Sequence, residues 1–231
     1  MGTTYVESFS DGPGGWYGWD EQGAAALTIR DGAAVSRSPW WVDYNHAPPG
    51  GGYLHILFAL NTRDGASTRH VAGENRFVSG RFPTDFTGAN ISVRIRGDLD
   101  QKDARVVLLA QADIVEPVRT RVNSVLAAQP LIVTREWSEQ SLTCAPDNGQ
   151  WQCLGSRHDR MDTYGWGPIA PVLRDVNLDI IFVLFPLDVV PTEALPGDIH
   201  LRRAGRDFTV DRSRLPVGEV MLDEVRIEFG D

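Results

Sequence analysis

Polar and apolar residues alternate along much of this 231-residue chain, and a period of two predicts β-strands. Residues 90–96 alternate without a break, with Ile91, Val93 and Ile95 on one face, and residues 225–229 alternate in the same way. Successive side chains of a strand point to opposite faces, so each segment should bury one face. Further strands are expected at 25–29, 53–60, 76–81, 106–112, 131–136, 141–144, 151–154, 177–185 and 208–210.

Helical periodicity is scarce, and only residues 118–128 and 169–173 fit short helices. Clusters of Gly, Pro, Asn and Asp separate the expected strands at short intervals. Many short strands joined by turns indicate an all-β sandwich or jelly roll. Neither an internal repeat nor a linker-like segment is visible, so we expect one domain spanning residues 1–231.

The two ends of the chain resemble a known fold superfamily. The segment VESFSDG at 6–12, followed by Gly15-Trp16, resembles the first strand of laminin-G-like and concanavalin A-like jelly rolls. The segment VMLDEVRI at 220–227 resembles their closing strand. This resemblance covers about twenty residues and implies a two-sheet antiparallel jelly-roll sandwich of concanavalin A type, with the first and last strands close together.

The same resemblance raises the question of a structural calcium ion. Several carbohydrate-active members, including family 16 glycoside hydrolases, hold calcium between their first and last strands. By that resemblance Glu7 and Asp223 are candidate ligands, because calcium prefers carboxylate and carbonyl oxygens. The alternative is that both acids are solvated residues at a sheet edge. The catalytic E-x-D-x-x-E strand of family 16 is absent, so glycoside hydrolysis by that carboxylate pair is not expected.

The segment WWVDYNHAPPGGGYLHILFAL at 40–60 combines aromatic and imidazole side chains with a Pro-Gly turn. Glycines let a ligand approach the backbone closely, and aromatic faces with polar edges suit a sugar-sized or aromatic ligand. The alternative is that these aromatics cap the end of the core. The walls of the predicted binding site are Trp40, Trp41, Tyr44 and Asn45, together with Trp166 from a second aromatic loop.

Strand parity predicts the floor of that site. Tyr53, His55 and Ala59 should share one face of the 53–60 strand, opposite Leu54 and Ile56. If the neighbouring strands belong to the same sheet, one face gathers the polar residues Tyr53, His55, Arg94, Gln111, Asn177 and Asp179. Each of these alone could be an ordinary outward-facing polar residue. Together they predict a groove for a glycan or another small polar or aromatic ligand.

Two other functions remain open beside carbohydrate recognition or processing. Tyr, His, Arg and Gln are the residue types that polysaccharide lyases use, so a lyase-type β-elimination or isomerisation is an alternative. In it His55 or His46 is the base, Tyr53 the acid and Arg94 the group that neutralises a carboxylate; His46 could equally hydrogen-bond to the Gly-rich turn. The third hypothesis is a non-catalytic structural or interaction module.

Charge and motifs exclude several functions. The formal net charge of −9 disfavours nucleic acid or an anionic membrane as a partner. A membrane-spanning stretch, a secretory signal, a G-x-S-x-G elbow, a P-loop, a GxGxxG motif and an HExxH motif are all missing. We therefore expect a soluble protein that requires no cofactor beyond the candidate calcium. Its oligomeric state stays open.

The two cysteines, Cys144 and Cys153, flank the sequence APDNGQWQ. If Asn148-Gly149 forms a two-residue hairpin turn, the cysteines lie directly opposite each other, within reach of a disulfide. Such a bond would indicate an oxidising compartment, whereas the missing signal indicates the opposite. The alternative is two free thiols.

Overall fold

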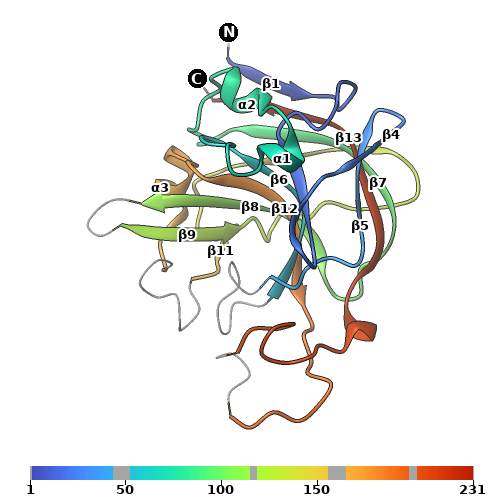
Figure 1. Cartoon of the computed structure of the whole chain (residues 1–231). Helices are drawn as coiled ribbons and strands as arrows, with labels where there is room; N and C mark the ends of the chain where they lie inside the picture. Colours follow the sequence, from blue (N-terminus) through green and yellow to red (C-terminus); the bar gives the residue numbers. More distant parts are fainter. Residues whose placement is uncertain (1, 44–52, 115–118, 156–164, 198–201, 231) are drawn as a thin grey trace.

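The computed structural model describes residues 2–43, 53–114, 119–155, 165–197 and 202–230, which form two antiparallel sheets packed against each other (Figure 1). Sheet A contains, in spatial order, β10 (Ser138–Thr143), β7 (Asn90–Asp100), β13 (Val217–Glu228), β5 (Ala33–Arg37) and β4 (Thr28–Arg30), with β1 (Thr4–Glu7) also paired to β13. Sheet B contains β11 (Gln152–Cys153), β9 (Thr120–Val125), β8 (Arg105–Ile114), β12 (Asp179–Leu187), β6 (Tyr53–Asn61), β2 (Trp16–Asp20) and β3 (Gly23–Ala25).

The main core lies between the sheets. From sheet A, Ile91, Val93 and Ile95 are buried in it, as the alternation predicts. From sheet B, Phe182 packs against Trp16 with stacked rings 6.1 Å apart. The predicted all-β, two-sheet antiparallel sandwich is confirmed. The narrower likeness to concanavalin A-like proteins stays a prediction.

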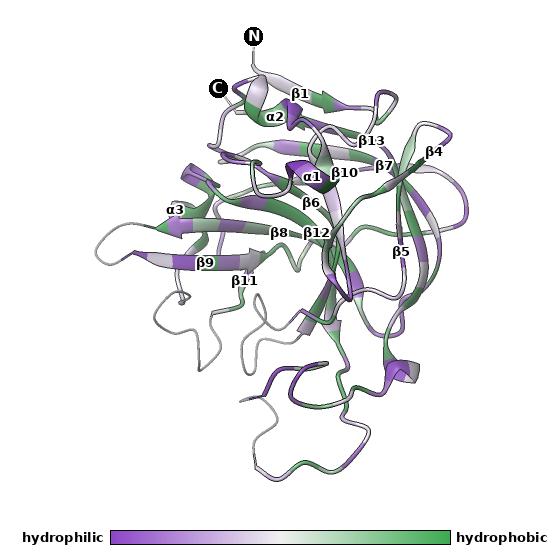
Figure 2. Ribbon diagram, in the orientation of Figure 1, coloured by the Kyte–Doolittle hydropathy of each residue, from purple (hydrophilic) through white to green (hydrophobic). Residues whose placement is uncertain are grey.

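Sheet B is also apolar on its outer face. Leu109, Ile181 and Val183 are fully buried there, in a second cluster separate from the main core. This explains why residues 177–185 read as a nearly continuous apolar run rather than an alternation, since both faces of β12 are covered. The strands β6, β8 and β12 are accordingly largely hydrophobic in Figure 2.

The helices are short: α1 (Arg69–Ala72), α2 (Arg76–Ser79) and α3 (Ile169–Arg174). Helix α3 confirms the expectation at 169–173, but α2 replaces the strand expected at 76–81. Asn75 caps α2 by accepting a hydrogen bond from the Val78 amide at 3.0 Å, a local interaction that favours the helix. None of the helices in the described ranges is long and apolar enough to cross a membrane.

Two other expected elements differ. Residues 118–128, expected to be helical, contain strand β9, because Val122 and Val125 pack on opposite faces of sheet B while the backbone pairs with β8. Residues 131–136, expected as a strand, make only a single bridge, between Leu131 and Val106. Tertiary pairing thus overrides the local preference of residues 118–128, whereas residues 131–136 lack a partner strand beyond that bridge in the described ranges.

A β-bulge in β6 changes the predicted parity. Phe58 lies opposite Phe182, but the next pair joins Ile56 to Val183, so Leu57 is the extra residue. Leu57 and Phe58 therefore both face the core, and Ala59 faces the outer side. The expectation that Ala59 shares a face with Tyr53 and His55 is wrong.

The two cysteines are free thiols. Asn148-Gly149 does lie in a turn, closed by the hydrogen bond from the Gln150 amide to the Asp147 carbonyl at 3.0 Å. However, this turn joins β10 in sheet A to β11 in sheet B and does not join two paired strands. Cys153 pairs with Ser124, so the predicted disulfide is wrong. Burial raises the pKa of the Cys144 thiol to about 12, which makes it unreactive.

Candidate ligand-binding site at one end of the sandwich

Residues 40–43 lie between the ends of β2 and β6. Trp40 bridges to Asp20 at the end of β2, and the Asp43 amide donates to the Leu54 carbonyl at 2.9 Å at the start of β6. Strands β2 and β6 pair only at Trp16–Leu60 and Tyr17–Ala59 and then separate, which leaves room for this segment. The two tryptophans of the segment are therefore held against the sheet by backbone pairing.

Trp40 and Trp41 have different surroundings. Trp40 is buried, and its indole N–H donates to the Ser36 hydroxyl at 2.9 Å, so it belongs to the core. Trp41 is half-buried and stacks on Trp19, with ring centroids 5.1 Å apart and planes 25° apart. Of these two tryptophans, both predicted to be walls of the site, only Trp41 is accessible to a ligand.

Trp41 lines a pocket of about 410 Å³, which we call the Trp41 pocket. Its polar lining comes from Glu21 in the β2–β3 turn, and from Arg206, Thr209 and Arg212 in the segment between β12 and β13. That segment is the orange-to-red chain beyond the strand ends at the bottom of Figure 1. Arg212 is ion-paired with Glu21. The pocket thus combines an aromatic wall with charged and hydroxyl groups.

His55 lies beside this pocket but inside the molecule. Its side chain is 1% exposed and lines a separate cavity of about 220 Å³ together with Trp40 and Arg212. Its Nδ1 lies 2.8 Å from the Trp41 carbonyl, which can only accept, so Nδ1 carries the proton and Nε2 the lone pair. Burial, aided by the charge of Arg212, lowers the pKa of His55 to about 4. His55 is therefore neutral at pH 7.

Tyr53 faces the same side of β6 as His55. It is half-buried against the core, and its hydroxyl donates to the Arg202 carbonyl at 3.5 Å. Arg94, in contrast, lies on β7 in sheet A, with its side chain on the outer face beside Trp137. The expectation that Arg94 shares a face with Tyr53 and His55 is wrong, because their strands belong to different sheets.

Arg94 instead lines a groove of about 780 Å³ on the outer face of sheet A, here called the Arg94 groove. A bulge in β13 turns Asp223 and Glu224 to this face together, where Arg94 ion-pairs with Asp223 and Arg226 lies 3.6 Å from Glu224. The lining residues are Ser8, Ser92, Val93, Arg94, Glu139, Ser141, Asp223, Glu224 and Arg226.

The candidate calcium ligands Glu7 and Asp223 do not share a site. Glu7 is buried and accepts from Arg76 at 2.7 Å and from the Phe9 amide at 3.0 Å, whereas Asp223 faces Arg94 on the outer side. Arg76 also donates to the Asp11 carbonyl at 2.6 Å, so a guanidinium supplies the positive charge at Glu7. Within the described ranges, no three His, Cys, Asp or Glu residues are grouped as metal ligands.

Gln111 and Asp179 lie in one row on the outer face of sheet B. Asp179 is directly opposite Asn61 on β6 and Gln111 on β8, and Gln111 is opposite Asn123 on β9. Asn61 donates to Asp179 at 2.5 Å and Gln111 donates to Asn123 at 2.7 Å. The prediction that Gln111 and Asp179 share a face is therefore right, but that face points away from His55.

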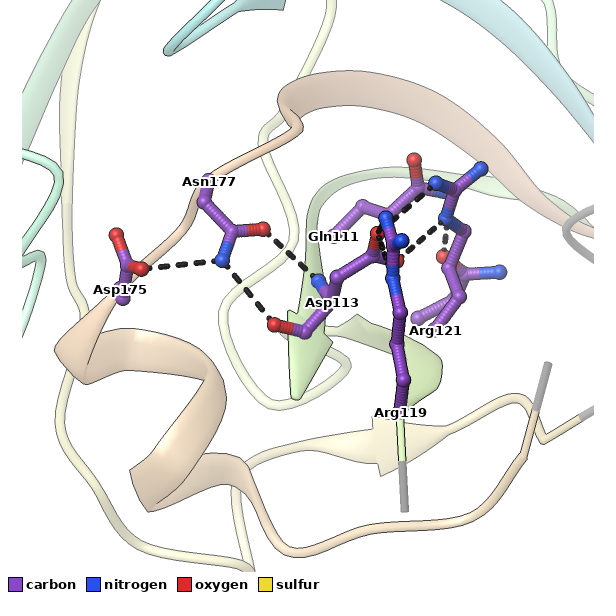
Figure 3. A network of polar contacts seen from close by, with 7 residues as sticks. Gln111, Asp113, Arg119, Arg121, Asp175 and Asn177 are labelled. Atoms are coloured by element: carbon purple, nitrogen blue, oxygen red, sulfur yellow. Dashed lines mark hydrogen bonds and ion pairs between the residues drawn. The ribbon is translucent and has the colours of Figure 1, made fainter. Parts of the chain in front are cut away.

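Asn177, which lies just before β12, hydrogen-bonds to the end of β8 in the same sheet (Figure 3). Its side chain accepts from the Asp113 amide at 2.9 Å and donates to the Asp113 carbonyl at 3.1 Å. Arg119 and Arg121 form ion pairs with the Asp113 carboxylate at 2.5 and 2.9 Å. Burial raises the pKa of Asp113, but these two arginines outweigh it, so the net shift is downward. Asn177 has a structural role here.

The remaining predicted residues lie elsewhere. Trp166 is 68% exposed and covers Gly155 beside β9 and β11, at the opposite edge of sheet B from Trp41. Tyr44, Asn45 and His46 lie outside the described residues. The structure therefore brings Trp41 and His55 to one end of the molecule and separates them from Arg94 and Trp166.

Sequence reasoning missed the three charged residues of the Trp41 pocket: Glu21, Arg206 and Arg212. A signal for the arginines exists, since residues 202–214 contain five of them in a chain whose net charge is −9. Trp41, which lines the same pocket, is about 170 positions away in sequence, and no periodicity connects segments so far apart.

Comparison with known proteins yields only distant structural similarity. No protein-family model matches the sequence, and no curated protein matches it. Three solved structures are similar over 98–100% of this chain. One comes from work on endo-acting O-glycanases that members of the human gut microbiota express to initiate mucin breakdown (12% identity, TM-score 0.38, 99% of that chain covered).

The other two structures are PfGH50B (8% identity, TM-score 0.36) and the solution structure of CtCBM11 (9% identity, TM-score 0.32). The similarity covers 86% of CtCBM11, but this chain spans only 23% of PfGH50B. At these identities and TM-scores the similarities identify neither a ligand nor an activity for this chain.

Proposed function

We propose that the protein binds glycans and that the Trp41 pocket is the binding site. The observation that carries this proposal is Trp41, which lines the pocket and stacks on Trp19 with ring centroids 5.1 Å apart. A rigid indole presents a flat apolar surface to a sugar ring at little cost in side-chain entropy.

The rest of the lining supports a polyhydroxylated ligand. Glu21 supplies acceptors, Arg206 and Arg212 supply donors, and the Thr209 hydroxyl can do both. Val42 and Val210 complete an apolar surround. A volume of about 410 Å³ lies within the range of ordinary ligand pockets and accommodates one to two sugar rings.

The lyase alternative has less support. It requires Tyr53 and Arg94 around one reacting centre, with His55 or His46 as the base, but Arg94 lies in the other sheet and His55 is enclosed. Its low pKa also makes His55 a weak base. A binding function needs only the residues that line the pocket and does not require Arg94 or His55 to reach a common centre.

The proposal is tested with a glycan array followed by calorimetry on Trp41→Ala. We expect wild-type protein to bind at least one oligosaccharide class and Trp41→Ala to bind it about 100-fold more weakly, since a ring stacked in a pocket contributes roughly 2–3 kcal/mol. Trp41→Phe, which keeps an aromatic face, should retain most of the affinity.

Trp166→Ala is the matched control, because Trp166 is another accessible tryptophan at the opposite edge of sheet B. It should bind like wild type. Equal binding by Trp41→Ala and Trp166→Ala, with both proteins folded by circular dichroism, would place the site elsewhere and refute the proposal.

A further inference from the structure

The segment between β12 and β13 concentrates positive charge in an acidic protein. Residues 202–214 contain five arginines and only two acidic residues, whereas the whole chain has a net charge of −9. Such a local reversal of charge raises the local concentration of anions near the segment. The arginines are Arg202, Arg203, Arg206, Arg212 and Arg214.

Four of these arginines already have partners. Arg203 pairs with Asp207 at 2.8 Å, Arg202 donates to the Pro196 carbonyl at 2.8 Å, Arg212 pairs with Glu21, and Arg214 pairs with Asp188. The side chain of Arg206 differs. It is exposed and makes no hydrogen bond or ion pair with any other residue in the described ranges, and it acts on Asp207 only through its charge.

Arg206, whose guanidinium has no partner in the described ranges, lines the Trp41 pocket, as Arg212 does. Against these two cations the pocket lining holds one carboxylate, Glu21, so its formal charge is +1. A neutral sugar would leave this charge uncompensated. An anionic group beside the Trp41 ring would accept charge-assisted hydrogen bonds from Arg206, in the forked geometry that suits carboxylate and sulfate.

We propose, on the basis of the glycan-binding function above, that the ligand of the Trp41 pocket is an anionic saccharide. Its carboxylate or sulfate is bound by Arg206. Arg212, which is ion-paired with Glu21, is the second cation in the lining. Arg206 thereby takes the role of neutralising an acidic sugar that the sequence suggested for Arg94. The preference for anionic over neutral saccharides then depends on Arg206. The general affinity for sugar rings depends on Trp41.

The experiment uses three matched oligosaccharides: one containing uronic acid, the same one with its carboxyls reduced to alcohols, and the reduced form carrying O-sulfate. Calorimetry in low salt should show the uronate form, the sulfated form or both binding at least about 10-fold more tightly than the reduced form. Arg206→Ala should remove that preference, because it weakens binding of the anionic forms at least about 10-fold and binding of the reduced form, which loses only a neutral contact, much less.

Arg135→Ala is the control, because it makes the same change in net charge at a side chain that is 79% exposed and does not line the pocket. It should keep the preference for the anionic forms. Equal affinity for all three oligosaccharides, or equal effects of Arg206→Ala and Arg135→Ala, would overturn the inference. The proposed function would survive that result if binding of the reduced form still depended on Trp41, so the two failures are distinguishable.

Discussion

The Trp41 pocket and the Arg94 groove contain the same kinds of charged residue but arrange them differently. The groove, at about 780 Å³, is nearly twice as large as the pocket, at about 410 Å³. In the groove each arginine has a neighbouring carboxylate, Arg94 with Asp223 and Arg226 with Glu224. In the pocket one arginine, Arg206, has no side-chain partner within the described ranges.

Aromatic residues make the second difference. Trp41 forms a wall of its pocket and is braced by Trp19. Trp137 does not line the groove. Instead it lies under Arg94 and Arg96, whose guanidinium carbons are 4.9 and 4.6 Å from its ring centroid. These cation–π contacts occupy the ring with the protein's own side chains.

The comparison shows that volume alone does not identify a ligand site. A groove whose arginines already have carboxylate neighbours gains little by binding a ligand, because the ligand must replace contacts that already exist. A smaller pocket with an accessible ring and an unpaired cation can form new contacts. The predictions below are given in order of expected effect, and those on Trp19 and Arg94 test this difference directly.

The largest expected effect concerns His55 and pH. Its pKa is about 4 in the folded protein and about 6.5 when unfolded, so the unfolded chain binds a proton first as the pH falls. Stability from neutral His55 is complete above pH 6.5 and is lost between pH 6.5 and 4. Each pH unit in this window costs roughly 1.4 kcal/mol, which gives a loss of about 3 kcal/mol.

Urea unfolding of wild type and His55→Gln at pH 7, 5.5 and 4 measures this effect. Glutamine can donate to the Trp41 carbonyl as His55 does, but it does not titrate. The stability difference between the two proteins should therefore shift toward the variant as the pH falls. A pH-independent difference would mean that His55 is solvated, and a shift toward wild type as the pH falls would mean that it is stabilised as a cation; both outcomes contradict its burial.

The fold could be predicted from the sequence where one face of a strand is buried and the other solvated. Residues 90–96 of β7 alternate cleanly for this reason, and their apolar residues are those found in the core. Prediction failed where local and distant forces compete. The Asn75 cap makes residues 76–79 helical, and pairing with β8 makes residues 120–125 a strand.

The site was harder to predict because it depends on register and on distant segments. Strand parity placed Gln111 with Asp179 correctly, since both lie in uninterrupted stretches of pairing between β8 and β12. It could not show the bulge at Leu57 or the division of β6 and β7 between two sheets. Trp41 was predicted from the aromatic composition of residues 40–60. Arg206 and Arg212 line the same pocket only because of the tertiary fold.

A smaller effect is expected from Trp19→Ala. Trp19 is half-buried and stacked on Trp41, so its removal should destabilise the protein by about 2 kcal/mol and weaken glycan binding about 10-fold by freeing the Trp41 ring to move. Trp137→Ala is the matched variant beside the Arg94 groove, because this ring lies under Arg94. It should also destabilise the protein, by about 1 kcal/mol, but should leave binding unchanged. Similar binding losses in both variants would contradict the assignment of the site to the pocket.

The smallest effect is expected from the Arg94–Asp223 pair. The two side chains are 42% and 27% exposed, so solvent screens their attraction, and a double-mutant cycle of Arg94→Ala and Asp223→Ala should give a coupling energy below about 1 kcal/mol. Neither variant should change glycan affinity by more than about twofold. A tenfold loss of affinity in Arg94→Ala would instead indicate that the ligand lies in the groove and exchanges this ion pair for its own contacts. The internal pairing of the groove would then be the resting state of the binding site, and Arg206 would be an ordinary solvated arginine.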